Sequence, residues 1–399
     1  MKLVSKKYLL PFILITSLFF IWGFARSVLD VLNKHFQDIL SISITQSGMV
    51  QAMTYLGYFL MALPAGILIT RGGYRRGVVT GLLLFAVGAF LFIPGERFLS
   101  FPVFLVALFI IGCGLAMLET SANPYAAELG DSATSSSRLN FAQSFNGLGC
   151  ILGPVIVGGF LFSDRHASVA LPYTIMGAAV LIVALIFSKV RLPEINKGEA
   201  PDSREDASMK GIMRSIKSLW GSSLFRFGIF TLFCYEIAEI AINSLFINYV
   251  LSAGWMDKTA ATALLSFGAL GLFMLARIAG SWVMSKVAAR KVLLFCGIGA
   301  AAGAVLVALN IGILSAIGLF ACYAFEAIMF PTIFAITISG VKGNVKIASS
   351  FLMMTPIGGA VGTILMSLIA DSVNFSTAFL VPAIAYGVVI LYASRKQQS

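Results

Sequence analysis

Ionisable side chains interrupt long apolar stretches of this chain at six positions. Five are carboxylates and one is a guanidinium: Asp30, Glu119, Glu236, Glu239, Glu326 and Arg26. A charged side chain within an apolar helix is costly unless it faces another polar group or a water-filled cavity. A carboxyl group that gains and loses a proton there is what proton coupling requires. We therefore expect a polar central cavity; the alternative is that some of these residues pair only to hold helices together.

Arg26 lies four residues before Asp30, so the two side chains share one face of a helix and can form an ion pair. No basic residue lies within a helical turn of Glu119, and the following Pro124 removes a helix hydrogen bond. We therefore expect Glu119 to carry a proton and Asp30 to act as its coupling partner. Glu326 also lacks a nearby cation and is the competing proton carrier.

Amide side chains accompany these charges, and amides both donate and accept hydrogen bonds, as a hydroxyl-rich ligand requires. The amides expected to contact a ligand are Asn123, Gln143, Asn146 and Asn243. Trp22 and Tyr55 are expected to stack on the apolar face of a sugar ring. Most of the 33 Phe residues are expected to pack against lipid or in the core instead.

The elements that position these residues follow from the composition. The chain has 399 residues, of which 59% are hydrophobic and 11% charged, and its mean hydropathy is +0.94. Soluble domains carry about 25% charged residues, so a soluble enzyme, a disordered chain and a fibrous protein are excluded. Apolar runs near the roughly 20 residues that a helix needs to cross a membrane recur throughout. The ten-residue alternation of β-barrel strands does not appear, which predicts an all-α integral membrane fold.

Breaks at charged, Gly, Pro and Asn residues divide the apolar sequence into twelve transmembrane helices. They are expected near residues 8–33, 45–70, 76–94, 99–127, 138–163, 170–188, 226–252, 259–285, 291–310, 313–341, 346–370 and 375–394. The first run follows three lysines, as in a signal peptide, but it is too long for one and no small-residue cleavage site follows. It is therefore expected to stay as the first helix.

Positive charges predict the orientation. With the N-terminus in the cytoplasm, 22 of the 28 Lys and Arg residues fall on the cytoplasmic side and 4 on the other, while Arg26 and Arg277 lie within spans. This asymmetry predicts that both termini are cytoplasmic. It also explains the net charge of +11, since the charge is spread over loops rather than gathered in a patch for nucleic acid.

One long polar stretch, roughly 189–222, separates six spans from six. Near its end, residues 210–220 set Leu219 and Trp220 against Arg214 and Lys217 at helical spacing. This pattern predicts an amphipathic helix on the cytoplasmic membrane surface, or a simple tether between halves. The chain therefore divides into an N-terminal half (1–188), a linker (189–225) and a C-terminal half (226–399).

The two halves contain similar residue patterns. Glu119 lies five residues before Pro124, and Glu326 lies five residues before Pro331. Two pseudo-symmetric six-helix halves with a cytoplasmic linker are the layout of the major facilitator superfamily fold. Arg26 and Glu239 occupy similar places in opposite halves, so we predict that they approach each other across the cavity in one conformation. The alternatives are that Arg26 pairs with Asp30 or binds an acidic sugar.

The sequence offers no site for a cofactor or a metal ion. All five cysteines fall within apolar spans, so no disulfide framework is expected. His35 and His166, the two histidines, lie near outer helix ends and make no metal-ligand spacing. No phosphate-binding loop is present, so transport driven by ATP is not expected. Neither enzymatic activity nor a nucleic-acid partner is expected.

Several stretches resemble the fucose/galactose/glucose:proton symporters of the major facilitator superfamily. They are Phe19–Phe24 with Leu29–Leu32, Leu118–Tyr125, Arg138–Asn146 and Met329–Phe334. The similarity covers nearly the whole chain, and Glu119 stands where fucose-type members carry their coupling glutamate. The resemblance implies that Asp30 and Glu119 form the proton-coupling pair and that Gln143 and Asn146 contact the sugar.

Some cavity residues depart from the family pattern. Leu29 replaces an Asn just before the first-helix Asp, Glu236 is an extra acid, and Glu326 stands where other members have an amide or an apolar residue. The cavity chemistry is therefore expected to differ from that of fucose-type members. The sugar is left open between neutral, amino and acidic forms.

Together these features predict a secondary active transporter that takes up a monosaccharide, a hexose or a fucose-like deoxyhexose, with protons by alternating access. The expected location is a bacterial inner membrane, with the sugar, protons and lipid bilayer as partners and a monomer as the functional unit. Two alternatives use the same fold: a proton-driven exporter of a sugar or small amphiphile, and a sugar sensor that does not transport. The buried carboxylates argue against a sensor, which has little need for a titrating pair.

Overall fold

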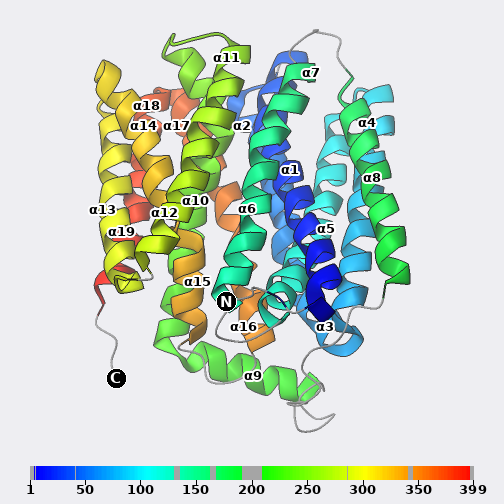
Figure 1. Ribbon diagram of the computed structural model, residues 1–399. Coiled ribbons are helices and arrows are strands. Elements are labelled where there is room, and N and C mark those ends of the chain that lie inside the picture. Colours follow the sequence, from blue (N-terminus) through cyan, green and yellow to red (C-terminus); the bar gives the residue numbers. More distant parts are fainter. Residues whose placement is uncertain are drawn as a thin grey trace.

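Long helices dominate the structure because apolar stretches inside a membrane must satisfy their backbone hydrogen bonds internally. The computed structural model describes residues 4, 6–40, 42–129, 135–161, 168–190, 209–284, 286–339 and 345–395. Within these residues every regular element is helical. The long helices run side by side between two ends of the bundle, and α9 lies across one of these ends (Figure 1).

The elements before residue 190 include five long helices. They are η1 (Lys6–Tyr8), α1 (Leu9–Leu40), α2 (Ile44–Ser47), α3 (Met49–Phe90), α4 (Phe92–Arg97), α5 (Phe101–Glu128), α6 (Ser135–Gly153), η3 (Pro154–Gly158), α7 (Gly159–Leu161) and α8 (Ala170–Lys189). Here η1 is a short 3-10 turn and η3 a π-helical turn that continues α6 into α7.

The elements after residue 208 begin with the linker helix. They are α9 (Met209–Gly221), α10 (Ser223–Ser252), α11 (Lys258–Ala263), η4 (Leu264–Leu270), α12 (Gly271–Met284), α13 (Ala289–Ala308), α14 (Gly312–Glu326), α15 (Met329–Ser339), α16 (Val345–Leu352), α17 (Ile357–Ser372), α18 (Phe375–Ala378) and α19 (Leu380–Ser394). The π-helical η4 joins α11 to α12.

The described residues contain eleven segments that are long and apolar enough to cross a membrane. One of them, Thr45–Arg97, has 53 residues. At 1.5 Å per residue it would extend about 80 Å as a straight helix, more than twice the hydrocarbon thickness. Gly73 has φ 78° and ψ 165°, which breaks the helix between the predicted spans 45–70 and 76–94. The segment therefore holds two crossings, and the predicted all-α fold with twelve spans is confirmed.

Two proline residues that look equivalent in the sequence have different effects on their helices. Helix α5 continues through Pro124 to Glu128. The tenth predicted span, by contrast, is split into α14 and α15 just before Pro331. A proline in the first turn of a helix removes no intrahelical hydrogen bond, which is where Pro331 lies in α15. The repeat predicted from Glu119–Pro124 and Glu326–Pro331 is therefore broken locally.

Contacts fall mainly within two groups of helices. Among the earlier helices, α3 packs against α5 and α8, and α1 packs against α6. Among the later ones, α13 packs against α14 and α19, and α10 against α17 and α19. Contacts between the groups include α3 with α16 and α17, and α1 with α10. The cavity described below lies between these groups.

Helix α9 is the amphipathic helix that the sequence predicts at 210–220. It packs against α10 and α16. Leu219 is buried in a cluster with Phe225, Ile347 and Ala348, whereas Met213 and Trp220 are exposed. Part of the apolar face of α9 thus covers the bundle, and part is free to meet lipid.

Candidate functional site

A cavity of about 650 Å³ lies between the two groups of helices. Side chains from α1, α3, α5 and α6 line one side, and side chains from α10, α12 and α15 line the other. Nine of the residues predicted from the sequence line it: Trp22, Arg26, Tyr55, Glu119, Asn123, Gln143, Asn146, Glu239 and Asn243. The cavity reaches Ala289, Ile338 and Met353, at the end of the bundle where α16 packs against α9.

The opposite end of the bundle is held closed by hydrogen bonds between the two groups. On α2, the Thr45 backbone N–H and hydroxyl donate to Asp371 Oδ2 of α17 at 3.0 and 2.5 Å. Deeper in, Asn248 of α10 donates to Gln37 of α1 at 3.0 Å, and Gln37 donates to Ser47 at 2.7 Å. These hydrogen bonds join the two groups at this end, whereas the cavity lining extends toward the α9 end.

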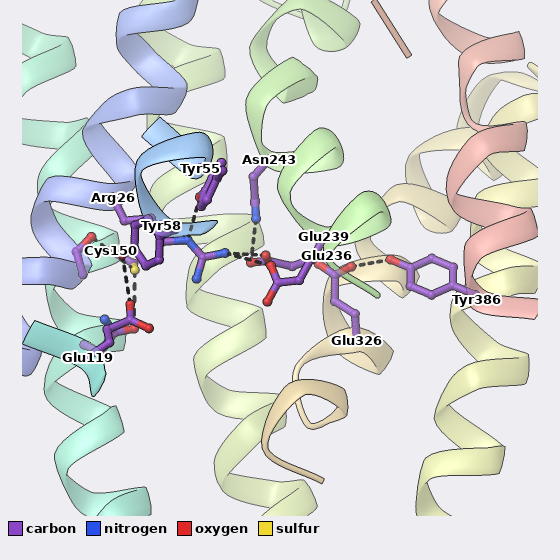
Figure 2. A network of polar contacts seen from close by, with 12 residues as sticks. Arg26, Tyr55, Tyr58, Glu119, Cys150, Glu236, Glu239, Asn243, Glu326 and Tyr386 are labelled. Carbon is purple, nitrogen blue, oxygen red and sulfur yellow. Dashed lines mark hydrogen bonds and ion pairs between the residues drawn. The ribbon is translucent and has the colours of Figure 1, made fainter. Parts of the chain in front are cut away.

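Arg26 joins the two sides of the cavity (Figure 2). Its Nη2 donates to Glu239 Oε2 at 2.5 Å, and its Nε donates to Tyr55 Oη at 3.2 Å. Asn243 Nδ2 donates to the other Glu239 oxygen at 3.0 Å. The predicted approach of Arg26 to Glu239 is confirmed. The alternative partner, Asp30, lies on α1, but its side chain is outside the described ones.

Glu236 lies one helical turn before Glu239 on α10 and is a less satisfied carboxylate. Its side chain is 2% exposed, and its Oε2 has no hydrogen-bond partner. The nearest cationic atom is Arg26 Nη2 at 3.9 Å, the atom that Glu239 already holds at 2.5 Å. An unpaired buried oxygen is costly, so Glu236 Oε2 is an acceptor in this network that lacks a donor.

Glu119 occupies the α5 side of the cavity, separate from the Arg26 ion pair. Tyr58 Oη of α3 donates to its Oε1 at 3.2 Å (Figure 2). Among the described residues no ion pair reaches Glu119. Its carboxyl group therefore faces the cavity with a neutral donor rather than a cation, as its sequence surroundings predict.

Three of the predicted amides, Asn123, Gln143 and Asn146, lie on the same side as Glu119 and form hydrogen bonds, whereas Asn243 lies on α10. Gln143 Nε2 of α6 donates to Asn123 Oδ1 of α5 at 3.4 Å, a long bond that a ligand could replace. Asn146 Nδ2 donates to the Phe19 carbonyl at 3.3 Å, which ties α6 to α1. Asn146 thus holds the cavity wall in shape as well as lining it.

Helices α6 and α1 pack closely against each other and form one wall of the cavity. A Cβ atom on Gly23 would lie 2.2 Å from the Asn146 carbonyl oxygen, and one on Gly149 would lie 2.3 Å from the Phe20 carbonyl oxygen. Only glycine permits such an approach of two helix backbones. The glycines therefore bring Asn146 close to Arg26 and Trp22 on the neighbouring helix.

The two predicted aromatic side chains line the cavity, buried among other rings. Trp22 packs on Phe19 with 4.2 Å between ring centroids, and Tyr55 packs on Tyr58 at 5.5 Å. Tyr235 of α10 lines the facing side. The cavity thus combines aromatic faces with amides and charges, a set suited to a small, hydroxyl-rich molecule.

Glu326 is not where the sequence suggested. We expected it to face the cavity from the C-terminal half, but it does not line the cavity, and it is fully buried at the end of α14. Tyr386 of α19 donates to its Oε2 (Figure 2). The Glu326 side chain therefore bonds to α19 instead of lining the cavity, and the repeat pattern did not predict this.

Sequence reasoning gave Arg277 no role, although it also lies within a span. Arg277 of α12 lines the cavity, donates to the Ala327 carbonyl at 3.0 Å and stacks on Phe273, with 4.6 Å from its guanidinium carbon to the ring centroid. The rule that identified Arg26, a charge inside an apolar span, could have identified it. In the described residues no group of three or more His, Cys, Asp or Glu could hold a metal ion.

Comparisons with known proteins identify the family and the fold. Residues 15–354 match the model of the Major Facilitator Superfamily. The chain is 34% identical to the L-fucose-proton symporter of Escherichia coli (strain K12), over 99% of this chain and 95% of that protein. It is 30% identical to the glucose/galactose transporter of Brucella abortus biovar 1 (strain 9-941), over 97% of this chain and 94% of that protein.

A solved structure shows the same fold. The crystal structure of a Major Facilitator Superfamily transporter, FucP, in the outward conformation matches with a TM-score of 0.78 at 33% identity. The match covers 99% of this chain and 100% of that one. The resemblance that the sequence motifs carry is therefore confirmed.

Proposed function

The chain belongs to the Major Facilitator Superfamily, and from this premise we propose that it is a secondary active transporter that takes up a monosaccharide together with protons. It acts as a transporter rather than an enzyme. The proposal rests chiefly on one observation: a single cavity carries the Glu119 carboxyl group beside the amides Asn123 and Gln143. The relatives described as L-fucose-proton symporter and glucose/galactose transporter support a sugar as the substrate.

Glu119 is the proton carrier in this proposal, with Asp30 as its coupling partner. Its carboxyl group lines the cavity without an ion pair among the described residues, so protonation leaves no cation behind unpaired. Glu326 is the weaker candidate, because it lies outside the cavity lining and is buried against Tyr386.

Transport proceeds by rocking of residues 1–188 against residues 226–399, with residues 189–225 as the link. With the α9 end in the cytoplasm, as the charge asymmetry predicts, the cavity is open inward. The contacts of Thr45 with Asp371 and of Gln37 with Asn248 then close the outer end. The protein works as a monomer in a bacterial inner membrane, with both termini in the cytoplasm.

Uptake into proteoliposomes tests the proposal. With an inward proton gradient, one monosaccharide among hexoses, deoxyhexoses, amino sugars and sugar acids should accumulate, and a protonophore should abolish the accumulation. Equal uptake with and without the gradient would reduce the protein to a facilitator. Loss of preloaded sugar driven by an inward proton gradient would instead identify an exporter, and binding without any flux would identify a sensor.

A further inference from the structure

We propose that the substrate is an amino sugar, a hexose with a protonated amine, whose ammonium group binds at the Glu236–Glu239 pair on α10. This inference rests on the proposed function, since it names the sugar class for the same cavity. It is carried by the unpaired oxygen of Glu236, the shared cation Arg26, and the charges that line the cavity.

Two carboxyl groups on α10 share one cation, Arg26. Glu236 and Glu239 are three residues apart on α10, so they share a face of the helix. In the described residues the ion pairs of both reach a single atom, Arg26 Nη2, at 3.9 and 2.5 Å. One guanidinium therefore faces two carboxyl groups, and Glu236 has no cation of its own among the described residues.

The two carboxyl groups differ in their hydrogen bonds. Both oxygens of Glu239 accept a bond, one from Arg26 and one from Asn243. Glu236 Oε2 accepts none and is buried. Arg26 Nη2 lies 3.9 Å from Glu236 Oε2 and 2.5 Å from Glu239 Oε2. A small shift of the guanidinium group would therefore bring it into hydrogen-bond distance of Glu236 in place of Glu239. A ligand cation at Glu239 would allow this exchange and leave both carboxylates paired.

Charged side chains of both signs line the cavity. Three carboxylates, Glu119, Glu236 and Glu239, and two guanidinium groups, Arg26 and Arg277, are the described charged residues that line the cavity. With Glu119 protonated, as in the sugar-loaded state of the proposed cycle, the other two carboxyl groups and the two guanidinium groups are equal in number, but only Arg26 forms ion pairs with Glu236 and Glu239. Arg277 does not reach the pair, since its Nε donates to the Ala327 carbonyl and its plane stacks on Phe273.

Other sugar classes fit less well. A neutral hexose can offer a hydroxyl to Glu236 but brings no second cation to the two carboxyl groups. A sugar acid would place another anion beside Glu236 and Glu239, which share one guanidinium. An ammonium group brings both a cation and up to three donors, and a charge-assisted hydrogen bond is about twice as strong as a neutral one. The amides and aromatic rings on the opposite wall remain for the hydroxyl groups and ring face.

Two matched sets of three ligands, tested on the purified full-length protein, test the inference. Glucosamine, glucose and N-acetylglucosamine share a ring, but only the first carries a positive charge; galactosamine, galactose and N-acetylgalactosamine form the matching set. Binding is measured by thermal shift and by competition for uptake. We expect one amino sugar to bind roughly tenfold or more tightly than its neutral counterparts. A neutral sugar that binds as tightly as its amino form would overturn the inference.

A variant pair locates the ammonium group. Glu236→Gln should remove most of the preference for the amino sugar, so that the ratio of amino-sugar to neutral-sugar affinity falls toward one. Gln143→Ala, on the opposite wall, should weaken amino and neutral sugars alike and keep their ratio. An unchanged ratio in Glu236→Gln would exclude this site.

The two proposals fail in different ways. If a neutral sugar accumulates with the proton gradient and no amino sugar is preferred, the proposed function stands and the amino-sugar inference is wrong. If no monosaccharide of any class is transported, the proposed function itself is wrong. The wild-type comparison decides the substrate class even if Glu236→Gln fails to fold.

Discussion

Arg26 Nη2 and Glu239 Oε2 lie 2.5 Å apart, although 213 positions separate the two residues in the chain. Arg26 belongs to α1 and Glu239 to α10, so the ion pair joins the first long helices of the two proposed halves. The pair lies at the cavity, between the α9 end and the Thr45–Asp371 contact near α2. A bond in this place must change when the two halves rock.

The Arg26–Glu239 pair gives the first prediction. Arg26→Ala should reduce the initial uptake rate at least tenfold, because it leaves two buried carboxylates without their cation, and such a loss costs about 3–5 kcal/mol. Adding Glu239→Gln should restore part of the uptake rate, since it removes the Glu239 carboxylate that Arg26→Ala leaves without a cation. Arg97→Ala, at an exposed position, is the control and should transport normally. A double variant no better than Arg26→Ala would refute the coupling of the pair.

The second prediction concerns the proton carrier. Glu119→Gln mimics the protonated acid, so it should still bind sugar and exchange it across the membrane, because neither step needs net proton movement. It should lose uphill accumulation, and its sugar binding should lose its pH dependence near neutrality. Counterflow and gradient-driven uptake in proteoliposomes measure the two activities separately.

Glu326→Gln is the matched comparison for Glu119→Gln. Because Glu326 lies outside the cavity lining and bonds to Tyr386, its variant should keep concentrative uptake, with a lower thermal stability from the weakened buried hydrogen bond. If Glu119→Gln accumulates sugar and Glu326→Gln does not, the proton site belongs to the C-terminal half and our assignment is wrong.

The closed end of the bundle gives a third prediction. Asp371→Asn weakens two hydrogen bonds from Thr45, so the inward-open state should lose up to about tenfold in population. Cys150 lines the cavity and reports this change, with the other four cysteines replaced. A membrane-impermeant maleimide should label it from the α9 side in the wild type, and less in Asp371→Asn.

Asp257→Asn is the control for this experiment. Asp257 caps its own helix α11, where its side chain accepts from the Ala260 N–H. The variant removes a carboxylate without changing the Thr45–Asp371 contact, and labelling of Cys150 should stay at the wild-type level. Equal labelling in Asp371→Asn and the wild type would mean that the Thr45 contact does not hold the outer end closed.

The fourth prediction concerns the packing of α1 against α6. Gly149→Ala should destabilise the protein by about 1–3 kcal/mol, because the new methyl group would lie 2.3 Å from the Phe20 carbonyl oxygen. Gly159→Ala is the control, since a Cβ atom there meets nothing within 4 Å. Thermal unfolding followed by size-exclusion chromatography measures both. Similar melting temperatures for the two variants would show that α1 and α6 can separate without cost.

The sequence by itself determined the membrane fold and the number of spans. Apolar runs of membrane length must form helices because the bilayer offers no partners for their backbone groups. The break near Gly73 was predictable for a related reason: Arg71, Arg75 and Arg76 cannot lie within the hydrocarbon core. The sequence also predicted most of the charged and amide residues that line the cavity, because a polar residue in an apolar span has few acceptable places other than a shared cavity.

Only the tertiary structure decided which of these residues meet. Arg26 could pair with Asp30 along its own helix or with Glu239 across the cavity, and spacing alone cannot rank a local partner against a distant one. The arrangement of α1 against α10 brings Glu239 to 2.5 Å and leaves Glu236 with an unpaired oxygen. The place of Glu326 was also decided by a partner distant in the sequence, Tyr386 of α19, which donates to its carboxyl group. Partner choice depends on distances across the bundle, and those distances exist only once the helices have packed.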